Sequence, residues 1–292
     1  MPTIAEAIAE GARRLSESGI LEDRRTASVL LGHVLGVDRA RLLIDSKEQI
    51  EESRYRQYLG LVERRAAGEP LQYITGHQEF YGLDFIVTPD VLIPRPETEL
   101  LVERVLKLAT VDEKKDNPVI ADIGTGSGCI AVTVAFHLPG ARVIASDISG
   151  AALAVARANA ERLGVKDHIE FREGDLFEPF AGLEGALDFV ASNPPYVPLE
   201  RPEFLQNEVR DWEPHVALFG GGSGLDFYRR LLAEGQRYVK PGGYLVCEIG
   251  YTQLDAIREM IAPEAWELVD VTSDLQSIPR TLTVRRANGD SE

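Results

Sequence analysis

Short apolar segments alternate with helical segments through the second half of the chain, and this alternation restricts the fold more than any other feature of the sequence. Buried strands that alternate with helices are typical of an open parallel sheet covered by helices on both faces. The sequence therefore predicts an α/β fold with a doubly wound, mostly parallel sheet and right-handed crossovers. Its seven strands are expected at residues 119–121, 142–146, 168–172, 187–192, 243–249, 266–271 and 281–285.

The first 75 residues have a different pattern, because apolar residues recur there at helical spacing. Four helices are expected, with Asp23 capping the second, Asp38 capping the third, and the fourth running over residues 47–67. No helix is apolar on all sides, so a small bundle is predicted. Alternating apolar and polar residues at 72–88 then indicate a β-hairpin.

Charge is divided unequally along the chain. Residues 1–75 hold 12 acidic and 11 basic side chains, so nearly all of the net charge of −16 lies after residue 75. A surface this acidic repels phosphate, which disfavours a bulk electrostatic grip on nucleic acid. With the change of pattern, the asymmetry indicates two parts. We expect a helical domain over residues 1–75, a hairpin linker over 76–94, and the sheet domain over 95–292.

Several classes of protein are excluded by features that the sequence lacks. The first residues do not have the basic and apolar regions of a secretory signal, and no apolar run approaches the roughly 20 residues that span a bilayer. Cys129 and Cys247 form no disulfide framework, and the histidines fall in no ligand spacing. We therefore expect a cytoplasmic protein with no metal site and no membrane contact. We also expect a monomer, although no sequence feature bears on the oligomeric state.

Three features that follow predicted strands indicate a nucleoside site. Glycines let the backbone approach a ligand that a Cβ would exclude, and open α/β sheets bind nucleotides at the carboxyl ends of their strands. Asp147 can accept hydrogen bonds from both hydroxyls of a ribose, and Leu176 can cover an adenine face. A purely structural turn or helix cap is the alternative interpretation of each. The glycine-rich turn itself consists of Gly124, Thr125, Gly126, Ser127 and Gly128.

A fourth feature, Asn193-Pro194-Pro195-Tyr196, follows the strand predicted at 187–192. Two successive prolines make a stiff turn that has few donors, so the Asn193 amide, the Pro194 carbonyl and the Tyr196 ring remain exposed. Two oxygen acceptors and an aromatic face match a planar substrate with an NH₂ group, whose lone pair they would help to localise. A rigid turn with a buried tyrosine is the alternative. A mobile glycine loop near the substrate is expected at residues 220–224.

With these residues, the sequence resembles the S-adenosylmethionine-dependent amino-methyltransferases of the seven-stranded class. Wider motifs resemble the release-factor glutamine methyltransferases over nearly the whole chain. The resemblance implies a class I methyltransferase that uses S-adenosylmethionine. Its substrate would be the glutamine of the Gly-Gly-Gln motif in peptide chain release factors, methylated on the side-chain amide nitrogen and docked by the helical domain. The wider motifs lie at residues 72–76, 94–99, 208–214 and 224–230.

The resemblance also implies roles for single residues. The glycine-rich turn 124–128, Asp147 and Leu176 would hold the cofactor. Asn193 would lie between cofactor and substrate, with Pro194, Pro195 and Tyr196 around the glutamine amide, and catalysis would rest on Asn193, Pro194 and Tyr196.

Three rival functions stay open at this point. A glutamine of a large-subunit ribosomal protein fits the same motifs. The N6 amine of adenine in DNA or RNA offers the same chemistry, but the acidic charge disfavours it. A non-catalytic cofactor-binding adaptor would have no use for an intact Asn193 and Tyr196.

Overall fold

The computed structural model describes residues 1–113, 115–201 and 205–288. The chain divides into two compact units. The first consists of Met1–His77 with Gln206–Trp212, and the second of Gln78–Leu205 with Glu213–Glu292. Each unit has an apolar core of its own.

The first unit is helical, as predicted, and its core contains Tyr58, Leu15 and Leu30. Asp38 caps α3 as expected, since its side chain accepts a hydrogen bond from the Arg41 N–H. The helices of this unit are α1 (Ile4–Glu17), α2 (Asp23–Leu35), α3 (Arg39–Ile44), α4 (Glu52–Ala66), α5 (Leu71–Thr75) and α9 (Asn207–Trp212).

Two helices of this unit begin differently from the prediction. Asp23 does not cap α2 but is its first residue, and the side chain of the N-cap residue Glu22 makes no capping hydrogen bond. The start of α4 lies at Glu52, later than predicted, because Gln49 pairs with Thr3 in an antiparallel bridge. A residue in such a bridge is extended and cannot belong to a helix.

The hairpin consists of β1 (His77–Phe80) and β2 (Leu83–Ile86), which form a two-stranded sheet. Its two turn residues, Tyr81 and Gly82, have φ angles of 52° and 75°. Both are left-handed, as the tightest hairpin turn requires. The hairpin is shorter than predicted, because its expected first residues lie in helix α5 instead.

The second unit contains the predicted seven-stranded sheet, in the order β5-β4-β3-β6-β7-β9-β8. Strands β3 to β7 are parallel, and β9 is antiparallel to both β7 and β8. The chain runs outward from β3 in both directions, to β4 on one side and β6 on the other, which makes a crevice at their carboxyl ends. The strands are β3 (Val119–Ile123), β4 (Arg142–Asp147), β5 (Ile169–Glu173), β6 (Leu187–Ser192), β7 (Val239–Glu248), β8 (Trp266–Ser273) and β9 (Pro279–Arg286).

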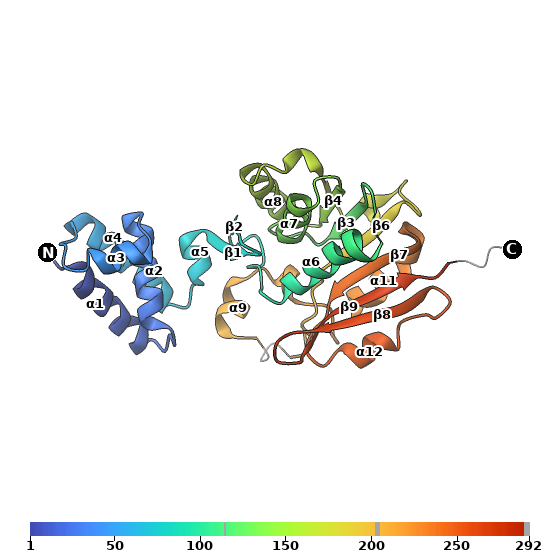
Figure 1. Cartoon of the computed structure of the whole chain (residues 1–292). Coiled ribbons are helices and arrows are strands. Elements are labelled where there is room, and N and C mark those ends of the chain that lie inside the picture. Colours follow the sequence, from blue (N-terminus) through green and yellow to red (C-terminus); the bar gives the residue numbers. More distant parts are fainter. Residues whose placement is uncertain (114, 202–204, 289–292) are drawn as a thin grey trace. The chain divides into compact units, whose positions relative to one another are not determined.

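Helices cover both faces of this sheet (Figure 1). Apolar side chains of α6, α7 and α8 share one core with the sheet, and those of α11 and α12 share the other. None of the described helices is both long and apolar enough to cross a membrane. The helices are α6 (Thr98–Lys107), α7 (Cys129–His137), α8 (Gly150–Arg162), α10 (His215–Leu218), α11 (Asp226–Tyr238) and α12 (Leu254–Arg258), with short turns at Leu108–Asp112, Lys166–His168 and Glu178–Phe180.

Candidate active site

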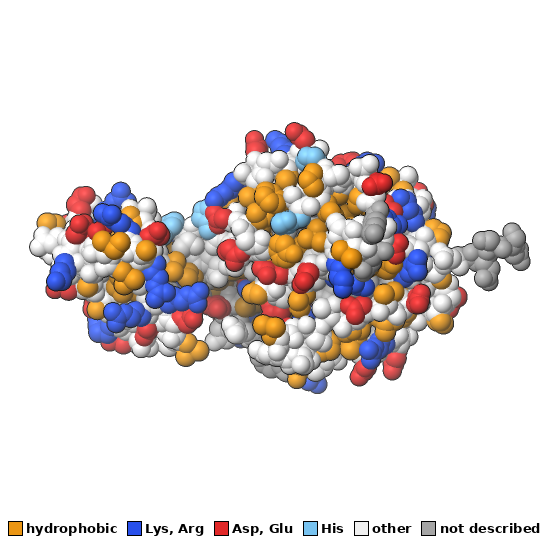
Figure 2. Space-filling view, viewed as in Figure 1, with side chains coloured by type: hydrophobic (Ala, Val, Ile, Leu, Met, Phe, Trp, Pro, Cys, Tyr) orange, Lys and Arg blue, Asp and Glu red, His pale blue; other side chains and the backbone are white. Residues whose placement is uncertain are grey.

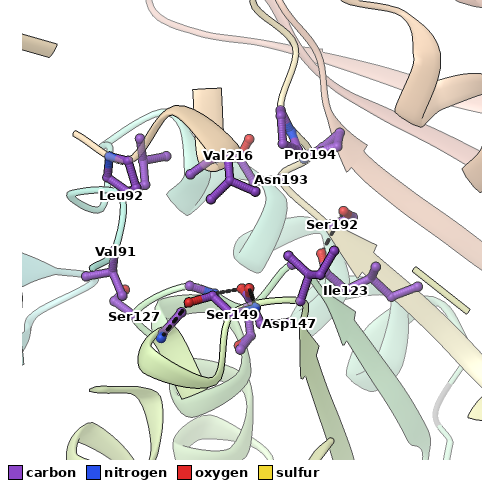
Figure 3. Close-up of a pocket in the computed structure, with 18 of the residues that line it drawn as sticks. Val91, Leu92, Ile123, Ser127, Asp147, Ser149, Ser192, Asn193, Pro194 and Val216 are labelled. Atoms are coloured by element: carbon purple, nitrogen blue, oxygen red, sulfur yellow. Dashed lines mark hydrogen bonds between the residues drawn. The ribbon is translucent and has the colours of Figure 1, made fainter. Parts of the chain in front are cut away.

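A pocket lies at the carboxyl ends of β3, β4 and β6, where the strand order reverses. Its volume is about 1060 Å³, part of which is open to solvent. Asp147 and Ser149 lie on one side of it, and Asn193 and Val216 lie on the other (Figure 3). The predicted site residues that line this pocket are Gly124, Thr125, Gly126, Ser127, Asp147, Leu176, Asn193, Pro194 and Pro195, whereas Gly128 and Tyr196 do not line it.

The glycine-rich turn leaves open space in front of its backbone. Gly124 and Gly126 have φ angles of 75° and 55°, and a Cβ added to either would meet no atom within 4 Å. The N–H groups of Gly124 and Thr125 donate to the Ser146 carbonyl at 2.9 and 2.8 Å, which ties the turn to β4. A Cβ at these glycines would therefore fill the pocket itself, which is what a site for a closely approaching ligand requires.

Gly128 has a different role from the other two glycines. Its φ is 82°, and a Cβ there would lie 3.0 Å from the Ala156 Cβ on α8. Nearby, the buried Asp122 carboxylate accepts hydrogen bonds from Thr125 Oγ1 at 2.6 Å and from the Ala131 N–H at 3.1 Å. Gly128 and Asp122 therefore support the turn through contacts with α8 and α7, outside the pocket.

Asp147 is held in a fixed orientation at the end of β4. Its Oδ2 accepts the Gly126 N–H and its Oδ1 accepts the Ser149 N–H, both at 2.9 Å. Burial raises the pKa of this carboxyl above its ordinary value. Leu176 also lines the pocket and has a φ of 44°, an uncommon conformation for a residue with a Cβ. A fixed acceptor and an apolar side chain therefore lie in one cavity.

The Asn193–Tyr196 turn is divided between the pocket and the core. Asn193 and the two prolines line the pocket. The Tyr196 ring was expected to be exposed but is partly buried, because it packs against the core of the second unit. Its hydroxyl donates to Glu248 Oε1 at 3.2 Å, and the negative charge of that carboxylate holds the pKa of Tyr196 well above its ordinary value.

Glu248 was missed by the sequence analysis. It is the last residue of β7, is 2% exposed, and accepts the hydroxyl of Thr98 at 2.6 Å. Thr98 in turn accepts a hydrogen bond from the Asn193 amide at 3.1 Å. Desolvation raises the pKa of Glu248 to about 7. The available signal was a carboxylate directly after the apolar run at residues 244–247.

One wall of the pocket, formed by residues 90–95 and 214–217, was also not predicted. The buried Glu213 joins these two segments, because it accepts the Ile93 N–H at 3.2 Å and forms an ion pair with Arg95. Val91 and Val216 contribute apolar side chains to this wall (Figure 3). These two segments therefore line the same cavity as Asn193 and the glycine-rich turn.

The glycine loop at residues 220–224 is packed tightly at its two ends, Gly220 and Gly224, whereas Gly222 and Ser223 are exposed. A Cβ at Gly220 would lie 2.3 Å from the Pro195 carbonyl oxygen, and one at Gly224 would lie 2.2 Å from the Tyr196 carbonyl oxygen. The Gly220 N–H also donates to the Val197 carbonyl at 3.0 Å. The glycines thus allow this loop to pack directly on the backbone of the Asn193–Tyr196 turn.

Neither cysteine has the environment of a nucleophile. Cys129 and Cys247 are free and buried, and burial raises the pKa of each thiol to about 12. Within the described ranges, no group of three or more His, Cys, Asp or Glu residues could hold a metal ion. The side chains that line the pocket carry amide, hydroxyl and carboxyl groups, together with the guanidinium of Arg95 and the thiol of Cys129.

Comparison with known proteins identifies the family. Residues 6–76 match the model of the PrmC N-terminal domain, and residues 97–204 match that of the methyltransferase small domain. A release factor glutamine methyltransferase from Koribacter versatilis is 41% identical over 285 residues, which cover 97% of this chain and 99% of that protein. The chain belongs to the release factor glutamine methyltransferase family. A member from Moorella thermoacetica is 45% identical over 258 residues, covering 88% of this chain and 89% of that protein.

A solved structure supports the fold of this family member. A methyltransferase from Pyrococcus furiosus superposes with a TM-score of 0.51 at 21% identity. The match covers 80% of this chain and 98% of that one. The seven-stranded architecture predicted from the sequence is therefore that of known methyltransferases.

Proposed function

We propose that the chain methylates the side-chain amide nitrogen of the glutamine in the Gly-Gly-Gln motif of peptide chain release factors, with S-adenosylmethionine as methyl donor. The observation that carries this proposal is the match over 97% of the chain to a protein named for this activity. The pocket supports it independently, because Asn193 offers an amide next to a cavity suited to a nucleoside.

The residues on one side of the pocket suit the adenosyl part of the donor. The open space in front of Gly124 and Gly126 admits a ligand against the backbone. The two Asp147 oxygens have about four acceptor positions. The backbone N–H groups of Gly126, Ile148 and Ser149 occupy three of them, which leaves acceptor capacity for a ribose hydroxyl. Ile148, which the sequence analysis did not single out, and Leu176 offer apolar contacts for an adenine.

The chain's own contribution to the reaction is alignment. When bound, the donor would supply a sulfonium methyl group: the nitrogen lone pair forms a bond to the methyl carbon as the carbon–sulfur bond breaks, and the electron pair of that bond stays on sulfur. Asn193 Oδ1 and the Pro194 carbonyl would accept the two N–H bonds of the substrate amide and hold its nitrogen in line. Such alignment can lower a barrier by about 7–11 kcal/mol. No base has to act first, because the proton can leave after the nitrogen has become cationic.

We assign the parts of the chain accordingly. Residues 1–75 would dock the release factor and 95–292 would carry out methyl transfer. Residues 76–94 would link the two parts, and the end of this linker, from residue 90, would also contribute to the wall of the pocket. Exposed apolar side chains on the first unit, Leu21, Leu43 and Ile44, support a docking role, because such side chains often mark an interface.

The decisive experiment presents competing substrates together. The protein is incubated with labelled S-adenosylmethionine, release factor, ribosomal proteins and DNA, and peptide mass spectrometry locates the label. We expect it on the Gly-Gly-Gln glutamine, with turnover about 100-fold lower in Asn193→Ala because a hydrogen bond to the reacting group is lost. Asn288→Ala, at an exposed asparagine outside the pocket, should behave as the wild type. Label on a ribosomal protein or on DNA alone would refute the proposed substrate.

A further inference from the structure

Four side chains at the edge of the pocket form one continuous series of hydrogen bonds. The Asn193 Nδ2 group donates to Thr98 Oγ1 at 3.1 Å, and the Thr98 hydroxyl donates to Glu248 Oε2 at 2.6 Å. The Tyr196 hydroxyl donates to the other oxygen of the same carboxylate at 3.2 Å. Asn193 and Thr98 line the pocket, whereas Glu248 is buried and does not. The series therefore connects the pocket to a buried carboxylate.

The number of available protons determines which group donates and which accepts in each of these hydrogen bonds. Above about pH 7 the Glu248 carboxyl is ionised and has no proton, so both hydroxyls must donate to it. Thr98 has one hydroxyl proton, and once that proton is directed at Glu248 its oxygen can only accept from Asn193. The Asn193 carboxamide must then turn its NH₂ group to Thr98. Its oxygen, which cannot bond there, is left to accept a hydrogen bond from a ligand.

This orientation matters because the two ends of a carboxamide have almost the same shape and opposite hydrogen-bonding character. A substrate NH₂ group needs an acceptor. If the Asn193 carboxamide were reversed, its NH₂ group would face the NH₂ group of the substrate. Two donors cannot form a hydrogen bond, so the substrate nitrogen would not be held. Packing alone cannot distinguish the two orientations, whereas the proton on Thr98 can.

We propose that Glu248 and Thr98 are positioning residues that fix the Asn193 carboxamide with its oxygen toward the substrate nitrogen. The inference rests on the proposed function, since it requires a substrate that presents an NH₂ group to Asn193. Neither residue takes part in the transfer itself. Both act through Asn193.

The surroundings of β7 support this role. Gln253 Nε2 donates to the Tyr196 carbonyl at 2.9 Å, and the Gly250 N–H holds the Gln253 side-chain oxygen at 3.1 Å. The end of β7 and the loop after it thus secure the Tyr196 end of the turn through its hydroxyl and its backbone. A buried carboxylate is also costly to desolvate, and glutamine would fill the same volume without charge. A positioning role accounts for an acid at this place.

Two substitutions of Thr98 separate positioning from packing. Thr98→Val keeps the volume and loses the hydroxyl, whereas Thr98→Ser keeps the hydroxyl and loses a methyl group. With both substrates saturating, we expect T98V to lower kcat about 10- to 100-fold, and T98S to retain much more of it. A role in packing alone predicts the reverse ranking and would overturn the proposal. The control is Thr133→Val, at a buried α7 threonine whose hydroxyl has no hydrogen-bond partner among the described residues.

A second measurement needs no substrate. In the ¹⁵N-labelled full chain, Asn193→Asp identifies the side-chain amide signals of Asn193 by their disappearance. We expect these signals to shift and to exchange faster with solvent in T98V and in Glu248→Gln, but to stay near their wild-type positions in T98S. Unchanged Asn193 signals in T98V and E248Q would refute the positioning role even if glutamine methylation stands. Conversely, wild-type protein that leaves glutamine unlabelled refutes the proposed function, while the amide signals still test the positioning.

Discussion

At the scale of the residue, two buried carboxylates, Asp122 and Glu248, hold parts of the site in place although burial of their charge lowers the stability of the fold. Each is at most 2% exposed and each has its pKa raised to about 7, mainly by desolvation. Asp122 ties Thr125 to α7, and Glu248 holds Thr98 and Tyr196. Both carboxylates therefore fix the positions of residues at the site, although the protein interior disfavours their charged forms.

This arrangement predicts a particular dependence of stability on pH. In the unfolded chain both carboxyls ionise near their ordinary pKa values of 3.8 and 4.5, whereas in the folded chain they keep their protons up to about pH 7. The folded state then binds more protons, so the free energy of unfolding should fall as pH rises from about 5 to 7, by a few kcal/mol. Thermal unfolding measured at pH 5, 6, 7 and 8 checks this.

Glu248→Gln is the variant that isolates one of the two groups. It should show a smaller decrease in melting temperature between pH 5 and pH 8 than the wild type, because only one of the two carboxyls, that of Asp122, is left to titrate. An equal decrease in both proteins would contradict the prediction. The polar and titratable groups around Glu248 are Thr98 and Tyr196, which are hydrogen-bonded to it, and Glu97, Arg280, Cys129, Cys247 and Tyr228, which interact with its charge.

At the scale of elements, the contact of α1 with α4 depends on a missing side chain. A Cβ at Gly11 would lie 1.9 Å from the Tyr58 hydroxyl oxygen. Tyr58 cannot move away easily, because its ring is fully buried and its hydroxyl donates to the Ala7 carbonyl at 3.2 Å. Gly11→Ala should therefore destabilise the first unit by about 1–3 kcal/mol, the usual cost of overpacking a core. Chemical denaturation followed by circular dichroism measures this loss.

Gly60 in α4 provides the matched control. It is exposed, and a Cβ there would meet no atom within 4 Å. Gly60→Ala should stabilise the helix by up to about 1 kcal/mol, because alanine is the better helix former. Equal effects of the two substitutions would show that helix propensity, and not the contact with Tyr58, determines stability here.

At the scale of the whole molecule, the two parts of the chain differ in charge, since nearly all of the net negative charge lies after residue 75. Lys and Arg side chains gather on the face of the first unit that Figure 2 shows. Leu43 and Ile44 on α3 are 68% and 75% exposed. If this unit docks the release factor, the double variant Leu43→Ser, Ile44→Ser should raise KM for the intact release factor about tenfold, by losing apolar contact area. Its kcat should not change, and steady-state kinetics measures both values.

The control for this prediction is a fully exposed leucine on the second unit. Leu275→Ser should leave KM for the release factor unchanged, because Leu275 lies in the turn between β8 and β9. A short glutamine peptide should also be methylated equally well by the double variant and the wild type. An unchanged KM for the intact release factor in the double variant would argue against docking through α3.

Properties that depend on a few neighbouring residues could be predicted from the sequence. The spacing of apolar residues gave the order of helices and strands, because burial on one face or on both imposes its own period. The turn at Gly124 and Gly126 and the stiff Pro194-Pro195 turn were predicted for the same reason, since glycine and proline restrict only their own backbone and that of their neighbours. These local rules were enough to put the pocket at the ends of β3, β4 and β6.

Only the tertiary structure decided which distant groups complete the site and where some elements begin. Thr98 and Glu248 are 150 residues apart in sequence, yet they share a hydrogen bond, and Arg95 meets Glu213 in the same way. The first residue of α4 likewise depends on the pairing of the preceding chain with Thr3. Contacts of this kind have no local signature, because the sequence does not distinguish a polar residue that faces solvent from one that bonds to a buried partner. The sequence determined the elements and their turns, and packing of the whole chain selected the residues that hold Asn193 in place.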